Sequence, residues 1–447
     1  MPNHLILIHG YSDRGGSFKT WKQRLVAKGY PADRIHIVTY ESLTDEVTLK
    51  DIAEGFDRAL RTKAGLGEGD EFDVIVHSTG MLVVRSWLVT YAARQRRLKR
   101  LIAIAPATFG SPLAHTGRST LGALFKGRKE LGADFLEAGQ EVLYGLELGS
   151  RFTWDLAHED LIGRPPFYGA DADTPYAFVF CGDSAYGGLR RMINKPGTDG
   201  TVRLAGCALN TRKVTLDLTR PSEDEEVQRR VKLEPWSNLD MPVYLVPDLN
   251  HGTILTDPPA DLVDRVHAAL AVDSKGDFEA WSATTSALFA DTRENAPKFQ
   301  QFVVHAVDER GDGIADFDLR LLTRDARDRF VELSGFDLDV HVYGRDPSYR
   351  AFHVSLDDLK PDLLESLAIQ VTASSGSRLV GYLGYNIESQ TISVQRQAVQ
   401  TVQIDITPML RRKDFTFFYP FTTTLVELKL NREPLPHDKT NDVCWFI

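Results

Sequence analysis

The 447-residue sequence has no apolar run of the roughly 18 residues that a membrane-spanning helix needs, so no membrane span is expected. It has only three cysteines, Cys181, Cys207 and Cys444, which cannot all pair. So few thiols in a long chain favour a reducing compartment, and a Cys181–Cys207 bridge is the weaker alternative. The first residues lack the basic and apolar regions of a signal peptide. We therefore expect a cytoplasmic protein, with signal-less secretion as the alternative.

An excess of positive charge is also missing, because 62 acidic residues outnumber 52 lysines and arginines. The net charge of −10 gives no general attraction to nucleic acid or to anionic lipid. The basic run 94–100 is interpreted as the solvated end of a helix. No Cys-x-x-Cys, His-Glu-x-x-His or Gly-x-Gly-x-x-Gly motif occurs, so neither a metal site nor a cofactor is predicted. The acidic segment 308–316 predicts a β-turn rather than a calcium loop, because Arg310 occupies a ligand position.

The composition, with 43% hydrophobic and 26% charged residues, is typical of a globular protein with a well-filled core. Its length predicts two or three domains. The first 270 or so residues alternate short apolar runs with helical patterns such as 51–62 and 261–271, which indicates a doubly wound, mostly parallel α/β sheet. The predicted strands are residues 5–9, 34–40, 74–77, 101–105, 176–181 and 243–246.

Two insertions interrupt this rhythm. Residues 113–172 combine Gly-rich turns with amphipathic helical patterns and are predicted to cover the edge of the sheet. Residues 213–233 alternate apolar and polar side chains before an acidic run, which is interpreted as a solvent-facing hairpin.

The pattern changes near residue 273. We predict an α/β domain over residues 1–272, a linker or bridging helix over 273–297, and an all-β, sandwich-like domain over 298–447, because short period-two segments follow one another there. The aromatic run Phe415–Phe421 is interpreted as a buried strand.

A lone hydroxyl, Ser78, stands where an apolar strand pattern passes into an apolar helix pattern. Serine at such a junction is either an ordinary helix N-cap or a nucleophile held on a tight turn. Asp199 and His251 follow later strands, and the order Ser, Asp, His suits nucleophilic catalysis, in which a histidine takes the serine proton and a carboxylate orients the histidine. Val76 departs from the Gly-x-Ser-x-Gly pattern of such turns.

The acid has two candidates, because Asp183 also follows a predicted strand, 176–181. His77 is interpreted as a packed residue, since its peptide directs it away from Ser78. His9 is interpreted as an anchor of the loop after the first strand.

The segments LILIHGY, VHSTG, APATFGSPLA, GTDGTV and NHGT together resemble the α/β-hydrolase fold, in its lipase and carboxylesterase branch, over residues 1 to about 272. The resemblance implies that Asp199 rather than Asp183 orients His251. It also implies that the N–H groups of Tyr11 and Thr79 form an oxyanion hole, and that a helical lid begins at Ser111. The C-terminal domain resembles no catalytic family.

These observations predict a serine hydrolase that cleaves carboxylic esters through a Ser78–Asp199–His251 triad and an acyl-enzyme. The substrate would be an ester or a lipid, with peripheral lipid contact and no nucleic-acid partner. One alternative is a phospholipase-type effector exported to a rival cell. Another is a non-catalytic binding protein with a degraded hydrolase domain. The departure from the motif at Val76 is the observation that supports this alternative. The acyl length and the oligomeric state are left open.

Overall fold

The computed structural model divides the chain into two compact units, which we call the α/β unit and the β unit. The α/β unit comprises Met1–Thr211, Trp236–Pro297 and Phe421–Thr423, and the β unit comprises Arg212–Pro235, Lys298–Pro420 and Thr424–Ile447. Within these bounds the structure describes residues 2–10, 16–40, 44–91, 96–114, 139–162, 167–169, 174–187, 195–219, 230–235, 239–377, 379–383, 385–386, 391–392, 399–410 and 416–434.

A parallel sheet of six strands forms the centre of the α/β unit, in the order β2-β1-β3-β4-β5-β8. Every neighbouring pair runs parallel. The strands lie within three residues of the predicted ends, so the predicted doubly wound α/β fold is confirmed. They are β1 (His4–Ile8), β2 (Ile35–Val38), β3 (Phe72–His77), β4 (Leu98–Ile104), β5 (Tyr176–Gly182) and β8 (Val243–Val246).

The winding of the chain reverses between β1 and β3. From β1 the chain moves outward to β2, then returns to β3 on the other side of β1 and continues through β4, β5 and β8. In open parallel sheets, ligands bind at the carboxyl ends of the strands beside such a switch point. Gly10 and Ser78 follow β1 and β3 at this edge.

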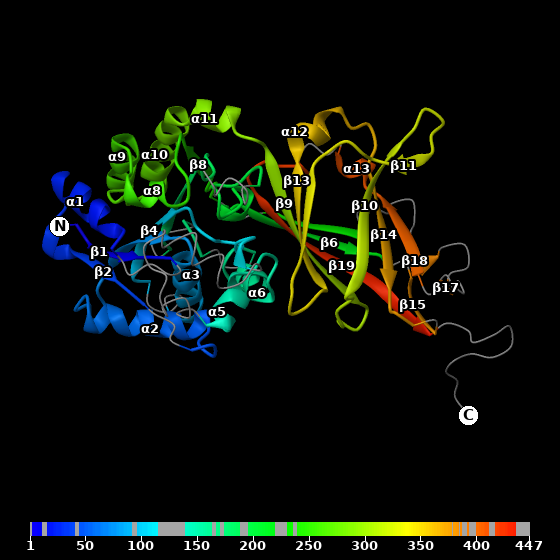
Figure 1. Ribbon diagram of the computed structural model, residues 1–447, viewed down its shortest axis with the longest axis horizontal. Coiled ribbons are helices and arrows are strands. Elements are labelled where there is room, and N and C mark those ends of the chain that lie inside the picture. The colour runs from blue at the N-terminus through cyan, green and yellow to red at the C-terminus, as the bar shows by residue number, and fades with distance from the viewer. Residues whose placement is uncertain are drawn as a thin grey trace. The chain divides into compact units, whose positions relative to one another are not determined.

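Helices pack in two groups, one above and one below the sheet as drawn in Figure 1. The first group is α1 (Phe18–Ala27), α8 (Thr253–Thr256), α9 (Ala260–Ala269), α10 (Lys275–Leu288) and α11 (Ala290–Asn295); the second is α2 (Leu49–Thr62), α3 (Gly80–Thr90), α5 (Gln140–Leu146) and α6 (Arg151–Asp160). Thus α10 and α11, which occupy the predicted linker, belong to the α/β unit. Helix α2 begins at a capping box between Thr48 and Asp51 and buries Ile52, Phe56 and Leu60.

A buried ion pair joins α6 to α3. The guanidinium of Arg85 donates to both carboxylate oxygens of Asp160, at 2.7 and 2.8 Å, and neither side chain is exposed. Arg85 also donates to the carbonyl of Thr108, and Tyr168 donates its hydroxyl to Asp160. Because the buried charges are paired and hydrogen-bonded, this network fixes the position of α6 against the core.

Residues 94 and 95 of the basic run 94–100 lie outside the described residues, and over residues 96–100 its interpretation as a solvated helix end is wrong. Strand β4 begins at Leu98, and both Arg97 and Arg100 are buried. Arg97 lies over the ring of Phe72, 5.5 Å from its centroid, and Arg100 forms an ion pair with the buried Asp73 at 3.4 Å. Their long apolar stems cover core surface while the charged ends find partners, an arrangement that charge counting does not reveal.

The β unit contains two larger sheets whose facing sides share one apolar core. A four-stranded sheet has the order β11-β10-β14-β18, and a larger sheet contains the path β12-β13-β9-β19-β6-β7. Phe302 and Phe352 of the larger sheet and Phe317 and Val371 of the smaller one meet in this core. The elements are β6 (Thr211–Asp217), β7 (Val231–Glu234), β9 (Phe299–Asp308), β10 (Asp316–Arg324), β11 (Phe330–Glu332), β12 (Leu338–Val342), β13 (Tyr349–Ser355), α12 (Leu356–Leu359), β14 (Ala368–Ser374), β15 (Val380–Leu383), β16 (Tyr385–Asn386), β17 (Thr391–Ile392), β18 (Val399–Asp405), α13 (Thr407–Leu410) and β19 (Thr423–Pro434).

The predicted hairpin over residues 213–233 exists, but its solvent-facing position was wrong. Strands β6 and β7 pair antiparallel and extend the larger sheet of the β unit. Val214, Leu216 and Val231 are buried in the core of that unit. The alternation of apolar and polar residues thus reflected a hairpin with one buried face. That face belongs to a sheet whose other strands come from the distant C-terminal part of the chain.

Of the run Phe415–Phe421, which was predicted to be a buried strand, residue 415 lies outside the described residues; Phe417, Phe418 and Phe421 are buried, but the segment is not a strand. Phe417 and Phe418 are less than a tenth exposed, and the described residues 416–421 form turns and irregular backbone. Phe421 has a φ of 58°, which no strand residue adopts.

The segment 308–316 forms the predicted turn between β9 and β10. The carboxylate of Asp308 accepts N–H groups from Arg310 and Asp312, at 2.9 and 3.0 Å. The carboxylate thus closes the turn locally.

Of the predicted insertion 113–172, residues 115–138 lie outside the described residues. Helices α5 and α6 follow them, with Val142, Leu143 and Leu146 buried along α5. A lid therefore stays a prediction. No helix among the described residues has the length and apolarity to cross a membrane.

Candidate active site

Ser78 lies between β3 and α3 in a backbone conformation that L-residues rarely adopt. Its φ is 52°, and the residue is only 4% exposed. Its N–H donates to the carbonyl of Ile104, and its own carbonyl accepts the N–H groups of Met81 and Ala107. These hydrogen bonds hold the strained turn in place. Strained backbone of this kind is concentrated at functional sites of proteins. The N-cap of α3 is Thr79, so Ser78 is not an ordinary helix cap.

Glycines on both sides allow the backbone to close tightly around Ser78. A Cβ atom at Gly10 would lie 2.7 Å from the Cβ of Ser78, and one at Gly80 would lie 3.0 Å from the carbonyl oxygens of Ile8 and His9. Val76 is fully buried and lies opposite Ala103, a small residue, in the register of β3 with β4.

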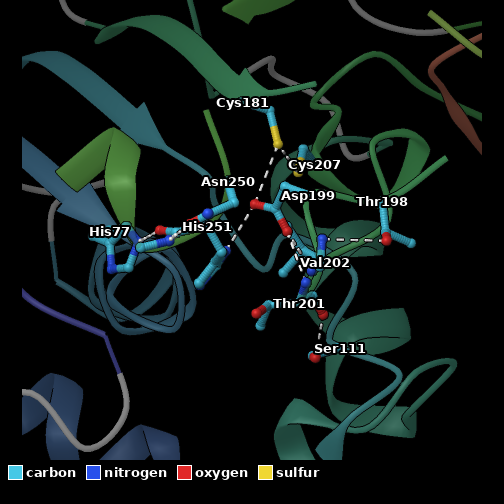
Figure 2. Close-up of polar contacts among 12 residues, drawn as sticks. His77, Ser111, Cys181, Thr198, Asp199, Thr201, Val202, Cys207, Asn250 and His251 are labelled. Atoms are coloured by element: carbon cyan, nitrogen blue, oxygen red, sulfur yellow. Dashed lines mark hydrogen bonds and ion pairs between the residues drawn. The ribbon is translucent and has the colours of Figure 1, made fainter. Parts of the chain in front are cut away.

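His251 follows β8 and is bonded to Asp199, which lies in the loop after β5. Its Nδ1 is 2.8 Å from Oδ2 of Asp199, and neither side chain is exposed (Figure 2). The backbone N–H of His251 also donates to the carbonyl of Asp199, at 3.0 Å. The side chain of Asn250 accepts the N–H groups of Gly252 and Thr253, which closes the turn that carries the imidazole.

The carboxylate of Asp199 is oriented by its own loop. Its Oδ1 accepts the N–H groups of Thr201 and Val202, at 2.9 and 2.8 Å (Figure 2). The hydroxyl of Ser111 donates to the carbonyl of Thr201 at 2.6 Å and holds the loop from the other side. Because Oδ1 is engaged with the backbone, Oδ2 is the oxygen that faces His251.

Asp183, the competing acid, makes different contacts. Its Oδ1 accepts the N–H of Asp248 at 2.8 Å and the hydroxyl of Ser184 at 2.9 Å. The bond from Asp248 joins the loop after β8 to the loop after β5. The structure therefore brings Asp199, and not Asp183, onto the imidazole of His251.

His77 connects the residue next to Ser78 with the loop that carries His251. Its Nε2–H donates to the carbonyl of His251 at 2.9 Å, and the two rings lie 4.7 Å apart. Burial, followed by the electrostatic effect of the adjacent His251 ring, lowers the pKa of His77 well below its usual value, so the His77 ring is neutral. His77 is thus the packed residue that the sequence predicted.

His9 is the predicted anchor of the loop after β1. The N–H of Tyr40 donates to its Nε2 at 3.2 Å, so the ring proton sits on Nδ1 and is donated to the carbonyl of Gly10 at 2.6 Å.

Two thiols near the carboxylate of Asp199 were not predicted as part of the site. Cys181 of β5 lies with its Sγ 3.6 Å from Oδ2 of Asp199, and Cys207 follows at 3.7 Å from Cys181 (Figure 2). Both are free thiols, so the alternative of a bridge between them was wrong. Burial raises the pKa of both, which keeps them protonated and lets Cys181 donate its S–H to the carboxylate. The one feature of the sequence that could have pointed to Cys181 was its place at the end of a predicted strand.

The predicted oxyanion-hole residues are only partly described. Thr79 is fully buried at the start of α3, directly after Ser78. Tyr11 lies outside the described residues. The role of both N–H groups stays a prediction.

Comparison with known proteins identifies a fold. No family model and no curated protein matches this chain. The structure of phospholipase PlaB from Legionella pneumophila matches 98% of the chain and 96% of its own length, with a TM-score of 0.74 and 23% identity. The same protein in complex with thio-NAD matches over the same shares, with a TM-score of 0.75 and 22% identity. A carboxylesterase from Bacillus subtilis, CesB, covers 60% of the chain with a TM-score of only 0.31. The likeness to PlaB extends over both units and shows that this chain has an α/β-hydrolase fold with an accompanying β domain.

Proposed function

We propose that this protein is a serine hydrolase that cleaves carboxylic esters, with Ser78 as nucleophile, His251 as general base and Asp199 as orienting acid. The observation that carries the proposal is the fully buried bond between Asp199 and His251, at the sheet edge where Ser78 occupies a strained turn. His77 supports it, because it joins the residue next to Ser78 to the backbone of His251. A strained serine and a carboxylate-oriented histidine at strand ends are the parts that acyl transfer needs.

The reaction would proceed in two halves. Ser78 attacks the ester carbonyl as the Nε2 of His251 takes its proton, and Asp199 stabilises the imidazolium through Nδ1–H. The N–H of Thr79, with that of Tyr11, would hold the oxyanion. His251 then gives its proton to the departing alcohol, which leaves an acyl group on Ser78. A water molecule then attacks the acyl carbon as His251 takes its proton, and His251 passes that proton to the Oγ of Ser78 as the acid is released.

A lipid ester is the more specific candidate substrate. PlaB is named as a phospholipase, and its likeness to this chain includes the β unit, not only the α/β unit. The α/β unit also holds a cavity of about 260 Å³ at the carboxyl ends of β1 and β2, whose lining includes Ile8, Tyr40, Phe56 and Val83. A largely apolar cavity of this size beside the switch point would accept part of an acyl chain.

Filling this cavity should change the chain-length preference. Gly55 of α2 lines it, and a Cβ atom there would meet no other atom within 4 Å. We expect Gly55→Phe to lower kcat/KM for p-nitrophenyl octanoate by about tenfold or more relative to acetate, because the new ring takes the space of several methylene groups. The measurement is a series of p-nitrophenyl esters from acetate to palmitate, run with and without phospholipid micelles.

Gly69→Phe is the matched control, since Gly69 also has open space around it but lies outside the cavity. Equal losses across the ester series in Gly55→Phe would contradict the acyl role of the cavity. No hydrolysis of any ester by the unaltered protein would contradict the proposed function and favour the non-catalytic alternative.

A further inference from the structure

The buried thiol of Cys181 contacts the carboxylate that orients His251. Its Sγ lies 3.6 Å from Oδ2 of Asp199, within hydrogen-bond range for sulfur, and neither side chain is exposed (Figure 2). The same Oδ2 accepts the Nδ1–H of His251 at 2.8 Å. One carboxylate oxygen therefore receives two donors, one from the residue that it orients and one from strand β5.

The other oxygen of Asp199 is occupied by its own loop, because Oδ1 accepts the N–H groups of Thr201 and Val202. An ionised carboxylate has about four acceptor sites, two on each oxygen. Within the described part of the chain, Cys181 supplies the donor for the site that Thr201, Val202 and His251 leave open. Loss of this donor would leave a buried acceptor site unsatisfied.

A second thiol favours the direction of this hydrogen bond. Cys207, at the end of the 3₁₀-helix η7 (Ala205–Cys207), donates its S–H to the sulfur of Cys181 at 3.7 Å. Its backbone is held in place, because its carbonyl accepts the hydroxyl of Thr108 at 2.8 Å. Since the sulfur of Cys181 accepts this bond, its own proton is directed to the carboxylate, which is a far better acceptor than a thiol.

The strength of the donor affects the charge that His251 faces. A thiol is a weak donor, so it satisfies Oδ2 while leaving most of the negative charge of Asp199 to stabilise the imidazolium. A stronger donor at this place would withdraw more of that charge. The S–H of Cys181 thus holds the carboxylate at a small cost to its electrostatic effect.

We propose that Cys181 is a positioning residue for the catalytic pair, whose S–H fixes Oδ2 of Asp199 toward Nδ1 of His251 and moderates the charge that the imidazole faces. The proposal rests on the proposed hydrolase function, and Cys181 touches neither the ester nor the reacting atoms. Without the thiol, the carboxylate is less well oriented. Its uncompensated charge then favours the imidazolium, which cannot accept the proton of Ser78.

Other titratable groups, from β3 and from the segment after β5, surround Asp199 and His251. All of them are unchanged when Cys181 is replaced, so a change in the pH dependence reports the loss of its S–H. They are His77 of β3, which is neutral, and, from the segment after β5, Cys207, which is protonated, Tyr186, whose hydroxyl bonds to that of Thr201 at 2.9 Å, and Arg203, which is buried.

Two substitutions with opposite changes of volume test the proposal. Alanine is smaller than cysteine and valine is larger, yet Cys181→Ala and Cys181→Val both remove the S–H. In each variant we expect the midpoint of the acid limb of kcat/KM for p-nitrophenyl acetate to rise by about half a pH unit, because the imidazolium is better stabilised. The plateau of kcat above this limb should fall by about tenfold, because Oδ2 is less well oriented.

Val179→Ala is the matched control. Val179 lies two residues before Cys181 on β5, so its side chain is on the same face of the sheet, and it is fully buried. The loss of its methyl groups should lower the melting temperature, as any cavity in this core would, but leave the midpoint and the plateau unchanged.

A shift of the midpoint in the Cys181 variants that is absent from Val179→Ala would support the role. Either Cys181 variant suffices if the other fails to fold, and melting temperatures monitor both. Unchanged midpoints in the Cys181 variants of an active enzyme, or an equal shift in Val179→Ala, would overturn this inference alone. Absence of hydrolysis by the unaltered protein would overturn the proposed function and this inference together.

Discussion

Replacement of Ser78 by alanine is expected to lower kcat for a short p-nitrophenyl ester by about 10⁶-fold, the size of effect known for the nucleophile of another serine hydrolase. The physical reason is that no other atom at this turn can form the acyl-enzyme. The strained φ of 52° belongs to the backbone and does not depend on the hydroxyl group. An alanine at this position should therefore keep the same backbone conformation. Steady-state kinetics with the purified variant measure the effect, and KM should change little.

Ser86→Ala provides the matched control. Ser86 is also a buried serine, two turns further along α3, and has no part in the proposed chemistry. It should retain nearly full kcat. If Ser78→Ala kept more than about a hundredth of the activity while Ser86→Ala behaved as expected, Ser78 would not be the nucleophile.

Asp199→Asn should lower kcat by about 10⁴-fold without unfolding the protein. Oδ1 of Asp199 accepts two backbone N–H groups, so the amide oxygen of an asparagine should take that place and its NH₂ should face His251. An N–H donor at that position requires an unprotonated Nδ1, which moves the ring proton to Nε2. The imidazole then has no lone pair with which to accept the proton of Ser78. The pH profile of kcat measures this loss, and melting temperatures of the variant show whether it remains folded.

Asp183→Asn separates the two candidate acids. An asparagine oxygen can still accept the N–H of Asp248, so this variant should stay within a few-fold of full activity, as expected for a bond outside the reaction. An inactive Asp183→Asn together with a largely active Asp199→Asn would reverse the assignment.

The sequence predicted the central sheet well because its strands are buried on both faces and read as short continuous apolar runs. All six strands of that sheet were found, and their alternation with helices indicated the parallel order. The hairpin of β6 and β7 was misplaced because alternation reports that one face is buried, not which element covers it. Arg97 and Arg100 were wrongly predicted to be solvated, because their partners Phe72 and Asp73 are distant in sequence and become neighbours only when β3 and β4 pair in the sheet.

The site was predictable to the extent that its groups follow strands. The carboxyl ends of β3, β5 and β8 meet at one edge, which places Ser78, Asp199 and His251 on the loops of a single region. The order of residues alone did not separate Asp199 from Asp183, since both follow β5; the family resemblance favoured Asp199, and the structure places Asp199 against His251. The contact of Cys181 with Asp199 was also beyond the sequence, because it depends on how the loop folds back over the strand.

Labelling with a fluorophosphonate tests the central claim most directly. The reagent reacts with a serine only where a base and an oxyanion hole activate the hydroxyl. We predict one adduct per chain by intact mass, located by peptide sequencing on Ser78, with labelling lost in Ser78→Ala and strongly slowed in Asp199→Asn. An unlabelled protein, or an adduct on another residue with Ser78 unmodified, would contradict the account.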